Sequence, residues 1–545
     1  MIENRKKVYD VIVIGSGNGA CGFLSHYIQQ KTGQRIAVVE EGDDFFNTSY
    51  ITHQRNWTQS YAEDDIFKLH KATTLDGVPI ISGRACTMGG GGSINYTMIH
   101  ESSEWLTTNI GKTVAYWEDL KKELNEKFAR EDPSKTQSVI TKHILDMARK
   151  CEFEDSTNIT CNIPDYKEGK AKLLHQFPTQ FDQFGQRTHS GVSLVDWSCV
   201  DLKTQCKVTK IEFETDDATS KERCVSVVMN NLKTGELESL YLSQYGKLIL
   251  CAGSATPNLL YAHKELLQNN AIGEHVSDHI LFPLGVYILP KEVAKNILPQ
   301  DVYVPVFATT ICKLDMQEQS TVCCFDFFAG NFEKLWFFIA HLYLAFLLPN
   351  FLKKLVISRP WLFSKIKCTV MKFVKKINGV FKFEQINLVT AIVKFTPSTD
   401  GAYINNGDDI TLGFFAQDGN DEKVAKKVIE ENLEFVNKLG DQPHPIFKWI
   451  FRYFTKIPYE KKQVKDYVDI YSKNFLLSEQ HLSGGCLFGK AIDSGAITQT
   501  DTGKLNGSSN VYVADLSTVP LPRISPQMTA YLIGYHVAKM LCSDR

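Results

Sequence analysis

A glycine-rich segment near the start of the chain has the residue types needed to hold a large anionic cofactor. Its sequence GSGNGA, residues 15–20, directly follows the apolar stretch Tyr9–Ile14. The first glycine permits a tight turn, the second lets the backbone approach a pyrophosphate, and the final alanine keeps the next helix close to the strand. The start of that helix offers unpaired N–H donors. Five residues here are predicted to bind the cofactor: Gly15, Ser16, Gly17, Asn18 and Ala20.

An acidic residue follows at the spacing expected for a dinucleotide site. Glu40 stands twenty residues after Ala20, in the apolar segment Arg35–Glu41, where it can accept hydrogen bonds from ribose hydroxyls. Strand, glycine turn, helix over 20–30 and second strand form a βαβ unit. This register favours a dinucleotide site over a simple glycine turn, and it does not separate FAD from NAD.

A second segment has four consecutive glycines, Gly89, Gly90, Gly91 and Gly92, between Met88 and Ser93-Ile94-Asn95. Four glycines remove side chains over about 13 Å of extended backbone. Apolar and aromatic residues flank the run on both sides, which fits a flexible loop poorly. We therefore expect a flat group to approach this backbone closely.

A third segment supplies a candidate base. His481 begins the glycine-rich sequence HLSGG, shortly before the predicted strand Val511–Asp515. An imidazole has an ordinary pKa near neutrality, so it can take a proton from a hydroxyl group within hydrogen-bonding distance. The chain has fourteen histidines, and most histidines are structural or exposed. The placement of His481, more than its type, favours a catalytic role.

These segments together resemble the glucose–methanol–choline (GMC) family of FAD-dependent oxidoreductases. The stretch GRACTMGGGGSINYT, residues 83–97, is similar to the family's flavin-binding segment, above all in cholesterol oxidases and long-chain alcohol oxidases. The resemblance implies that Gly89–Gly92 lie along the flavin pyrophosphate and isoalloxazine, with Asn95 hydrogen-bonding near the flavin. It also implies the fold, FAD as cofactor and alcohol oxidation.

Further matches to the family follow in order along the chain. Residues 185–190 resemble its GxRxS segment, residues 251–260 resemble a shortened second signature, and Asp278-His279 matches the pair that usually follows. Residues 481–490 are close to the cholesterol-oxidase form of the C-terminal block. By resemblance, three more residues contact FAD: Val208, Asp515 and Leu516.

One departure from the family concerns the second polar residue of the reaction site. PRISPQMT aligns with the family's asparagine–proline version, which puts Ser525 where asparagine is expected and Pro526 on the family proline. A serine hydroxyl can bond an alkoxide but reaches less far than an amide, and Gln527 is an alternative. Ser525 is therefore the second catalytic candidate, and reduced, altered or absent alcohol oxidation stays open.

The strands and helices that would position these residues predict an α/β (α+β overall) protein with a discontinuous Rossmann-like FAD-binding domain. Short buried strands recur at Lys247–Cys251 and Val511–Asp515. We expect residues 1–289 to form its first part, with some substrate-domain elements at 96–190, and residues 471–545 its last part. Residues 290–470 are expected to form an inserted substrate domain of antiparallel sheet and helices.

The insert has its own pattern. Asp301–Leu314 and Gln385–Phe395 are predicted strands, and Glu422–Leu439 has helical spacing. The apolar run Leu335–Leu348 is too short to span a bilayer and is followed by lysines up to residue 376. A buried helix is favoured, and an interfacial element contacting anionic lipid is the alternative.

Composition narrows the function classes. The formal net charge of −2 gives no basic field for nucleic acid, and no Cys/His spacing predicts a metal site. Without a signal or targeting sequence, a cytoplasmic protein is expected, with peripheral membrane attachment as an option.

The expected function is hydride removal from a hydrophobic alcohol, such as a sterol or long-chain alcohol, with His481 as base. The acceptor, oxygen or a redox partner, is left open. Two alternatives remain: a flavoprotein with lyase- or decarboxylase-like chemistry, and a flavin-binding subunit without activity.

Overall fold

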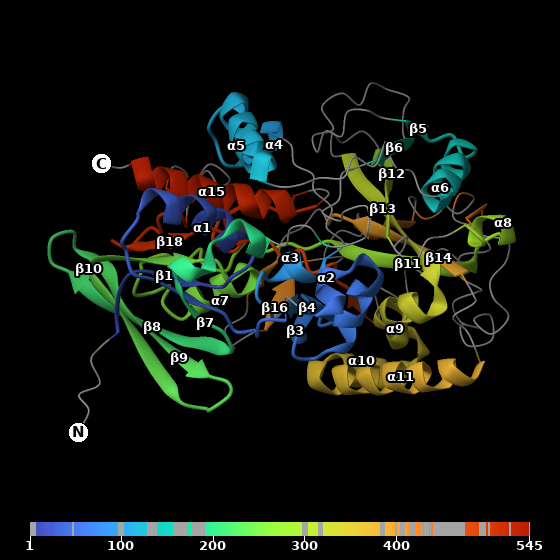
Figure 1. Cartoon of the computed structure of the whole chain (residues 1–545), viewed down its shortest axis with the longest axis horizontal. Helices are drawn as coiled ribbons and strands as arrows, with labels where there is room; N and C mark the ends of the chain where they lie inside the picture. The colour runs from blue at the N-terminus through green and yellow to red at the C-terminus, as the bar shows by residue number, and fades with distance from the viewer. Residues whose placement is uncertain are drawn as a thin grey trace.

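A computed structural model gives the arrangement of the elements (Figure 1). The structure describes residues 7–45, 48–95, 103–127, 139–155, 172–176, 187, 191–296, 303–313, 320–381, 387–397, 401–403, 409–413, scattered positions between 421 and 439, 475–489, 497–499, 502–522 and 525–543. Of the helix predicted at Glu422–Leu439, only those scattered positions are described. The ten described cysteines are free thiols.

The first sheet gathers strands from distant parts of the chain, as predicted. Its parallel part contains β7 (Asp201–Lys203), β2 (Ile36–Val39), β1 (Val8–Ile14), β10 (Leu237–Leu250) and β18 (Val511–Val513). All four residues of β2 and all three of β18 are buried, in keeping with a strand covered on both faces. The carboxyl ends of β1, β2, β10 and β18 meet at one edge of this sheet.

The same sheet continues as an antiparallel extension that the sequence did not reveal. Strand β8 (Cys206–Asp216) pairs with β9 (Lys221–Asn231), and β9 pairs with the first half of β10. Strand β10 is thus much longer than the predicted Lys247–Cys251, because its first half pairs with β9 and its second half with β1 and β18.

Helices α1 (Asn18–Gln30) and α15 (Gln527–Ser543) cover one face of this sheet (Figure 1). Glycines allow their backbones to touch. A Cβ at Gly22 would lie 2.2 Å from the carbonyl oxygen of Tyr531, and one at Gly534 would lie 1.9 Å from that of Gly19. This close contact fixes the C-terminal helix against the first glycine turn.

A second sheet forms the core of the predicted substrate domain and is antiparallel apart from its short edge pair. Its order is β11 (Ile280–Ile288), β14 (Asn387–Phe395), β13 (Ser320–Asn331), β12 (Tyr303–Lys313), β6 (Lys172–Gln176) and β5 (Glu154–Asp155). Strands β12 and β14 confirm the two predicted strands. Strand β11 precedes residue 290, where the insert was expected to begin, while β5 and β6 come from the expected 96–190 contribution.

A third sheet lies between the other two. Its order is β15 (Ala402–Tyr403), β16 (Ile410–Leu412), β3 (Phe67–Thr74), β4 (Pro79–Ala85) and β17 (Leu476–Leu477). Because β4 runs into the four-glycine segment and β17 runs into His481, this sheet carries both toward the same place.

The apolar run is a buried helix, α9 (Phe332–Leu347), as favoured from the sequence. Its side chains from Leu335 to Ala345 are buried against β13, β14 and the residues around Trp57. The alternative, in which this run itself lies in lipid, is wrong because its side chains are already buried in the protein core. Among the described residues, no helix combines the length and apolar character that crossing a membrane requires.

The basic tract forms two further helices outside α9, α10 (Asn350–Ile357) and α11 (Pro360–Phe381). The lysines of the tract divide between surface and interior, since Lys353 and Lys367 are buried. The remaining helices and turns are α2 (Ser49–Thr52), η1 (Gln54–Ala62), α3 (Gly91–Ile94), α4 (Ser103–Asn109), α5 (Val114–Lys127), α6 (Val139–Arg149), η2 (Gly191–Leu194), η3 (Trp197–Cys199), η4 (Gly253–Ala255), α7 (Thr256–Tyr261), α8 (Lys291–Ala294) and η7 (Leu516–Thr518).

Candidate active site

A cavity of about 870 Å³ brings the three glycine-rich segments together. The first glycine turn, the four-glycine run and the segment after β17 all contribute to its wall. Thirteen of the predicted site residues line it: Gly15, Ser16, Gly17, Asn18, Glu40, Gly90, Gly91, Asn95, Val208, His481, Asp515, Leu516 and Ser525. Ala20, Met88, Gly89 and Gly92 are not part of the lining.

The first turn is built by a glycine that no other residue could replace. Gly15 has φ +92°, and a Cβ there would lie 2.4 Å from the carbonyl oxygen of Cys251. The turn is held by Glu40, whose buried carboxylate accepts hydrogen bonds from the Ser16 N–H at 3.0 Å, the Ser16 hydroxyl at 2.7 Å and the Gly42 N–H at 2.7 Å. Burial raises the pKa of Glu40. The hydrogen bonds described for Glu40 are thus to other residues of the chain, and a hydrogen bond from a ribose to Glu40 remains a prediction.

The four-glycine run packs on this turn, backbone against backbone. The Gly89 N–H donates to the Ser16 hydroxyl at 3.0 Å, and a Cβ at Gly92 would lie 2.0 Å from the Asn18 side chain. A Cβ at Gly90 would lie 3.0 Å from the Cα of Gly17. A Cβ at Gly91 would meet nothing within 4 Å. Gly89 and Gly92 therefore serve packing, while Gly90 and Gly91 present bare backbone to the cavity.

Arg187, from the predicted GxRxS segment, fastens the end of the glycine run. Its guanidinium donates to the carbonyl oxygens of Gly92 at 3.0 Å and Asn95 at 2.7 Å, and to the Asn95 side chain at 3.1 Å. Burial lowers the pKa of Arg187 to about 9. Asn95 in turn donates to the side-chain oxygen of Gln527 at 2.9 Å, which links the glycine run to the start of α15.

Asp515 lines the cavity and links two loops at the edge of the first sheet. One oxygen of its buried carboxylate accepts from the Gly253 N–H at 2.8 Å and the Thr256 hydroxyl at 2.6 Å. The other accepts from the N–H and hydroxyl of Ser517 at 2.9 and 2.6 Å. Burial raises the pKa of Asp515. Asp515 thus aligns the loop after β10 with the loop after β18.

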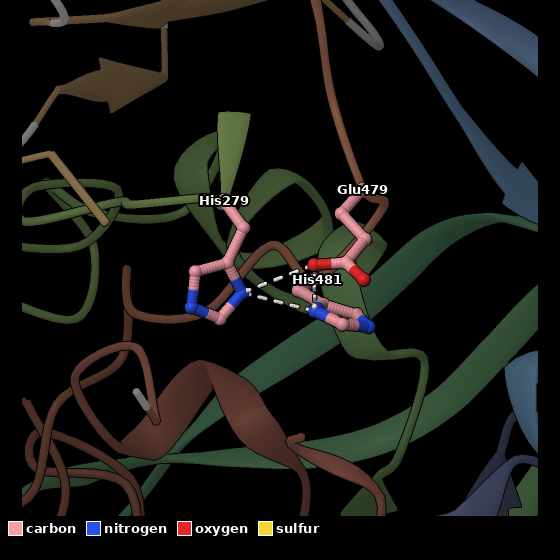
Figure 2. Close-up of side chains that lie close together, drawn as sticks. All are labelled: His279, Glu479 and His481. Carbon is pink, nitrogen blue, oxygen red and sulfur yellow. Dashed lines mark hydrogen bonds and ion pairs between the residues drawn. The ribbon is translucent and has the colours of Figure 1, made fainter. Parts of the chain in front are cut away.

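His481 stands in a cluster with His279 and Glu479 (Figure 2). Its Nδ1 lies 3.2 Å from a carboxylate oxygen of Glu479 and 3.0 Å from Nδ1 of His279. The Glu479 and His279 side chains are buried, whereas that of His481 is 18 % exposed. Figure 2 shows the other ring nitrogen of His481, Nε2, on the side of the ring away from His279.

These distances limit where the protons lie. Two N–H groups cannot point at each other across 3.0 Å, so only one of the two Nδ1 atoms carries a proton in this contact. Glu479 is nearer to His481 (3.2 Å) than to His279 (3.6 Å), which favours the proton on Nδ1 of His481. That tautomer leaves a lone pair on Nε2 of His481, as a base requires.

Glu479 stays ionised because a buried ammonium and an imidazole face it. Burial opposes its charge, but the nearby His481 and Lys394 lower its pKa below the ordinary value. The Lys394 ammonium, itself buried, lies 3.3 Å from the carboxylate. His279, Glu479 and His481 have the residue types of a metal site, with their ligand atoms within 4.8 Å of one another. The ammonium of Lys394 already supplies the positive charge there, so the group is better suited to hold a proton than a metal ion.

Asp278 holds the backbone of His481 in place. Its buried carboxyl accepts the backbone N–H of His481 at 2.9 Å and bonds the Ser478 hydroxyl. Between Glu479 and His481 the chain turns through Gln480, whose φ of +62° is uncommon for a residue with a side chain. The burial of Asp278 raises its pKa to about 7.

A pH dependence of stability follows from Asp278. Because its pKa is higher in the folded than in the unfolded chain, its contribution is present at low pH and is lost as pH rises through about 7. We expect Asp278→Asn, which cannot ionise, to lose less stability than the wild type between pH 5 and pH 8, by on the order of 2 kcal/mol. Thermal unfolding of the holoprotein should show a relative shift of about 2 °C in Tm. Parallel pH profiles of the two proteins would contradict this, because a constant offset between them reports only the lost hydrogen bond.

Three contributors to the cluster were not assigned roles from the sequence. His279 was noted only as part of a family pair, and Glu479 and Lys394 were not singled out. Glu479 stands two residues before His481, which was the only local signal. Lys394 lies on β14, and no sequence spacing could place it beside Glu479.

Comparisons with known proteins agree with this architecture. Residues 409–534 match the family model described as GMC oxidoreductase. No curated protein matches the chain in sequence. A mutant formate oxidase of Aspergillus oryzae shares the fold with a TM-score of 0.68 and 16 % identity, over 98 % of both chains. Pyridoxine 4-oxidase from Mesorbium loti has 0.65 and 13 %, over 97 % of this chain and 98 % of that one. A fungal aryl-alcohol oxidase has 0.57 and 13 %, over 99 % of both.

Residues 409–534 match a model of the family that the sequence resembles, and the fold shared over nearly the whole chain confirms the predicted fold class. The formate oxidase is described with a modified FAD, which is the cofactor that the sequence predicts for this chain. The residues present fit that cofactor: bare backbone at Gly17, Gly90 and Gly91 lines a cavity bounded by the carboxyl ends of four parallel strands.

Proposed function

We propose that the chain oxidises a hydrophobic alcohol, with His481 as the catalytic base. The observation that carries this proposal is the place of His481 in the cavity wall, with its Nδ1 3.2 Å from the carboxylate of Glu479 and 3.0 Å from Nδ1 of His279. His481 lines the same cavity as Gly90, Gly91 and Asn95. Bound FAD supplies the hydride acceptor for such a reaction.

The chain's own residues would handle the proton and orient the substrate. Nε2 of His481 would take the hydroxyl proton, and the ionised Glu479 would stabilise the imidazolium that forms. Ser525 and Gln527 line the cavity and are candidates to bond the substrate oxygen. Ser525 thus remains the proposed second catalytic residue, supported by its place in the lining.

An apolar wall supports the choice of a hydrophobic substrate. The cavity is also lined by Tyr61, Phe67, Ile94 and Leu482, and the last of these directly follows the proposed base. Sterols and long-chain alcohols are the proposed classes, on the likeness of the glycine blocks to the corresponding subfamilies. The structural relatives are named as oxidases, so molecular oxygen is the first electron acceptor to test and a redox partner the second.

Anaerobic titration of the purified yellow protein tests the proposal. We expect the flavin absorbance to bleach with alcohols, and more readily as the alkyl chain lengthens. The matched aldehydes and fatty acids are the controls. A spectrum that no alcohol changes would overturn the proposal. Turnover of an acid that leaves the flavin oxidised would instead favour the lyase- or decarboxylase-like alternative, which the serine at position 525 keeps in view.

A further inference from the structure

Helices α10 and α11 lie along one edge of the molecule and expose large apolar side chains (Figure 1). Phe351 is 80 % exposed, and Trp361 and Phe373 are each 62 % exposed, with Leu355 at 44 %. Among the described residues, Tyr245 is the only other aromatic side chain with comparable exposure. Such a concentration of exposed apolar groups on two adjacent helices indicates a surface made to be covered.

The charge around these side chains has one sign. From residue 334 to residue 383 the chain contains ten lysines and arginines and no aspartate or glutamate. Six of these basic side chains are exposed on the two helices and the turn between them, and no ion pair is described for any of the six. We call these six and the four apolar residues the docking face: Phe351, Lys354, Leu355, Arg359, Trp361, Lys365, Lys372, Phe373, Lys375 and Lys376.

The docking face follows the geometry of an amphipathic helix. At 100° per residue, positions 361, 365, 372, 373 and 376 of α11 fall on one side. Phe363, Ser364, Lys367 and Met371 fall on the other and are buried. The Lys365 ammonium lies 5.6 Å from the centre of the Trp361 ring, so cation and aromatic group are presented together.

We propose that the docking face binds the surface of a membrane that contains anionic lipids. Aromatic rings are favoured at the boundary between headgroups and acyl chains, and long lysine side chains can extend from that depth to the phosphates. A helix of this kind lies in the plane of the interface rather than across it. A nucleic acid would use the cations but would leave Phe351 and Phe373 uncovered, so lipid is the occupant that uses both parts of the face.

The docking face is one layer of side chains away from the cavity. Helix α11 packs on residues 62–67: the Cys368 thiol donates to the carbonyl oxygen of Ala62 at 3.1 Å, and the Ser364 hydroxyl bonds Asp64. The Lys367 ammonium lies 5.1 Å from the centre of the Phe67 ring. Phe67 and Tyr61 line the cavity. A membrane bound at the docking face would thus lie beside the apolar wall of the site.

Sedimentation of the full-length holoprotein with vesicles tests the proposal without any measurement of activity. At low salt we expect it to pellet with vesicles of phosphatidylcholine containing phosphatidylserine, and much less with phosphatidylcholine alone. Replacing Lys365, Lys372 and Lys376 with Gln should weaken the partition coefficient on the order of a hundredfold. Trp361→Ser/Phe373→Ser should weaken it at high salt as well, because apolar contact is not screened.

A matched triple variant controls for net charge. Lys221→Gln, Lys291→Gln and Lys295→Gln remove three exposed lysines from other surfaces and should leave vesicle binding unchanged. The flavin spectrum and Tm of each variant report folding. Equal loss in both triple variants would overturn the proposal, as would recovery of the wild type in the supernatant with every vesicle. Because these outcomes do not depend on turnover, they are distinguishable from failure of the proposed reaction.

Discussion

His481→Asn is expected to slow flavin reduction by a good substrate by about 10²–10⁴-fold, while the protein stays yellow. The substitution removes the lone pair on Nε2 that would take the hydroxyl proton. It changes little else, because the backbone N–H of His481 keeps its bond to Asp278 at 2.9 Å. Anaerobic stopped-flow absorbance at substrate saturation measures the effect directly, free of steps that involve the electron acceptor.

The comparison variants make this prediction specific. His143→Asn makes the same change on α6, where the ring contacts the carbonyl oxygen of Leu439, and should reduce flavin at the wild-type rate. Glu479→Gln keeps the base but removes the charge behind it. Its rate should fall less than that of His481→Asn, because the base is retained and only the anion beside the imidazolium that forms is lost. Unchanged reduction in His481→Asn would show that the base has been misassigned.

Gly91→Leu is expected to yield protein that folds but is purified with little or no flavin. A Cβ at Gly91 would meet no atom within 4 Å, and its φ lies outside the left-handed region, so neither packing nor backbone geometry opposes a side chain there. Gly91 lines the cavity, and a leucine would occupy space that the cofactor needs. Flavin content per chain, read from the ratio of visible to ultraviolet absorbance, is the measurement.

A graded series separates this effect from misfolding. Gly91→Ala adds one methyl group and should retain more flavin than Gly91→Leu. The apoproteins of both should match the wild-type apoprotein in Tm. Gly33→Ala serves as the contrast: its φ of +87° strains any side chain, yet the space around it is open and distant from the cavity. It should lower Tm slightly and keep its flavin. Full flavin content in Gly91→Leu would place the cofactor elsewhere.

Tertiary structure alone decided the chemistry around the base. Lys394 lies on β14 and Glu479 follows β17, and their buried contact at 3.3 Å exists only because two different sheets meet there. The exposed apolar part of the docking face was likewise not apparent from the sequence, because the most apolar run, Leu335–Leu348, is buried in α9. Burial depends on what packs against a segment, and a hydrophobic run has the same sequence whether a core or a lipid covers it.

The sequence by itself determined the parts in which backbone geometry dictates residue type. A left-handed turn that touches Cys251 admits only glycine at Gly15, and buried parallel strands need β-branched runs such as Val11–Ile14, so both can be read directly. Contacts between side chains carry no comparable requirement. The positions of Lys394, His279 and Asp278 around His481 depend on long-range packing, and many residue types would satisfy the local chain at each of them.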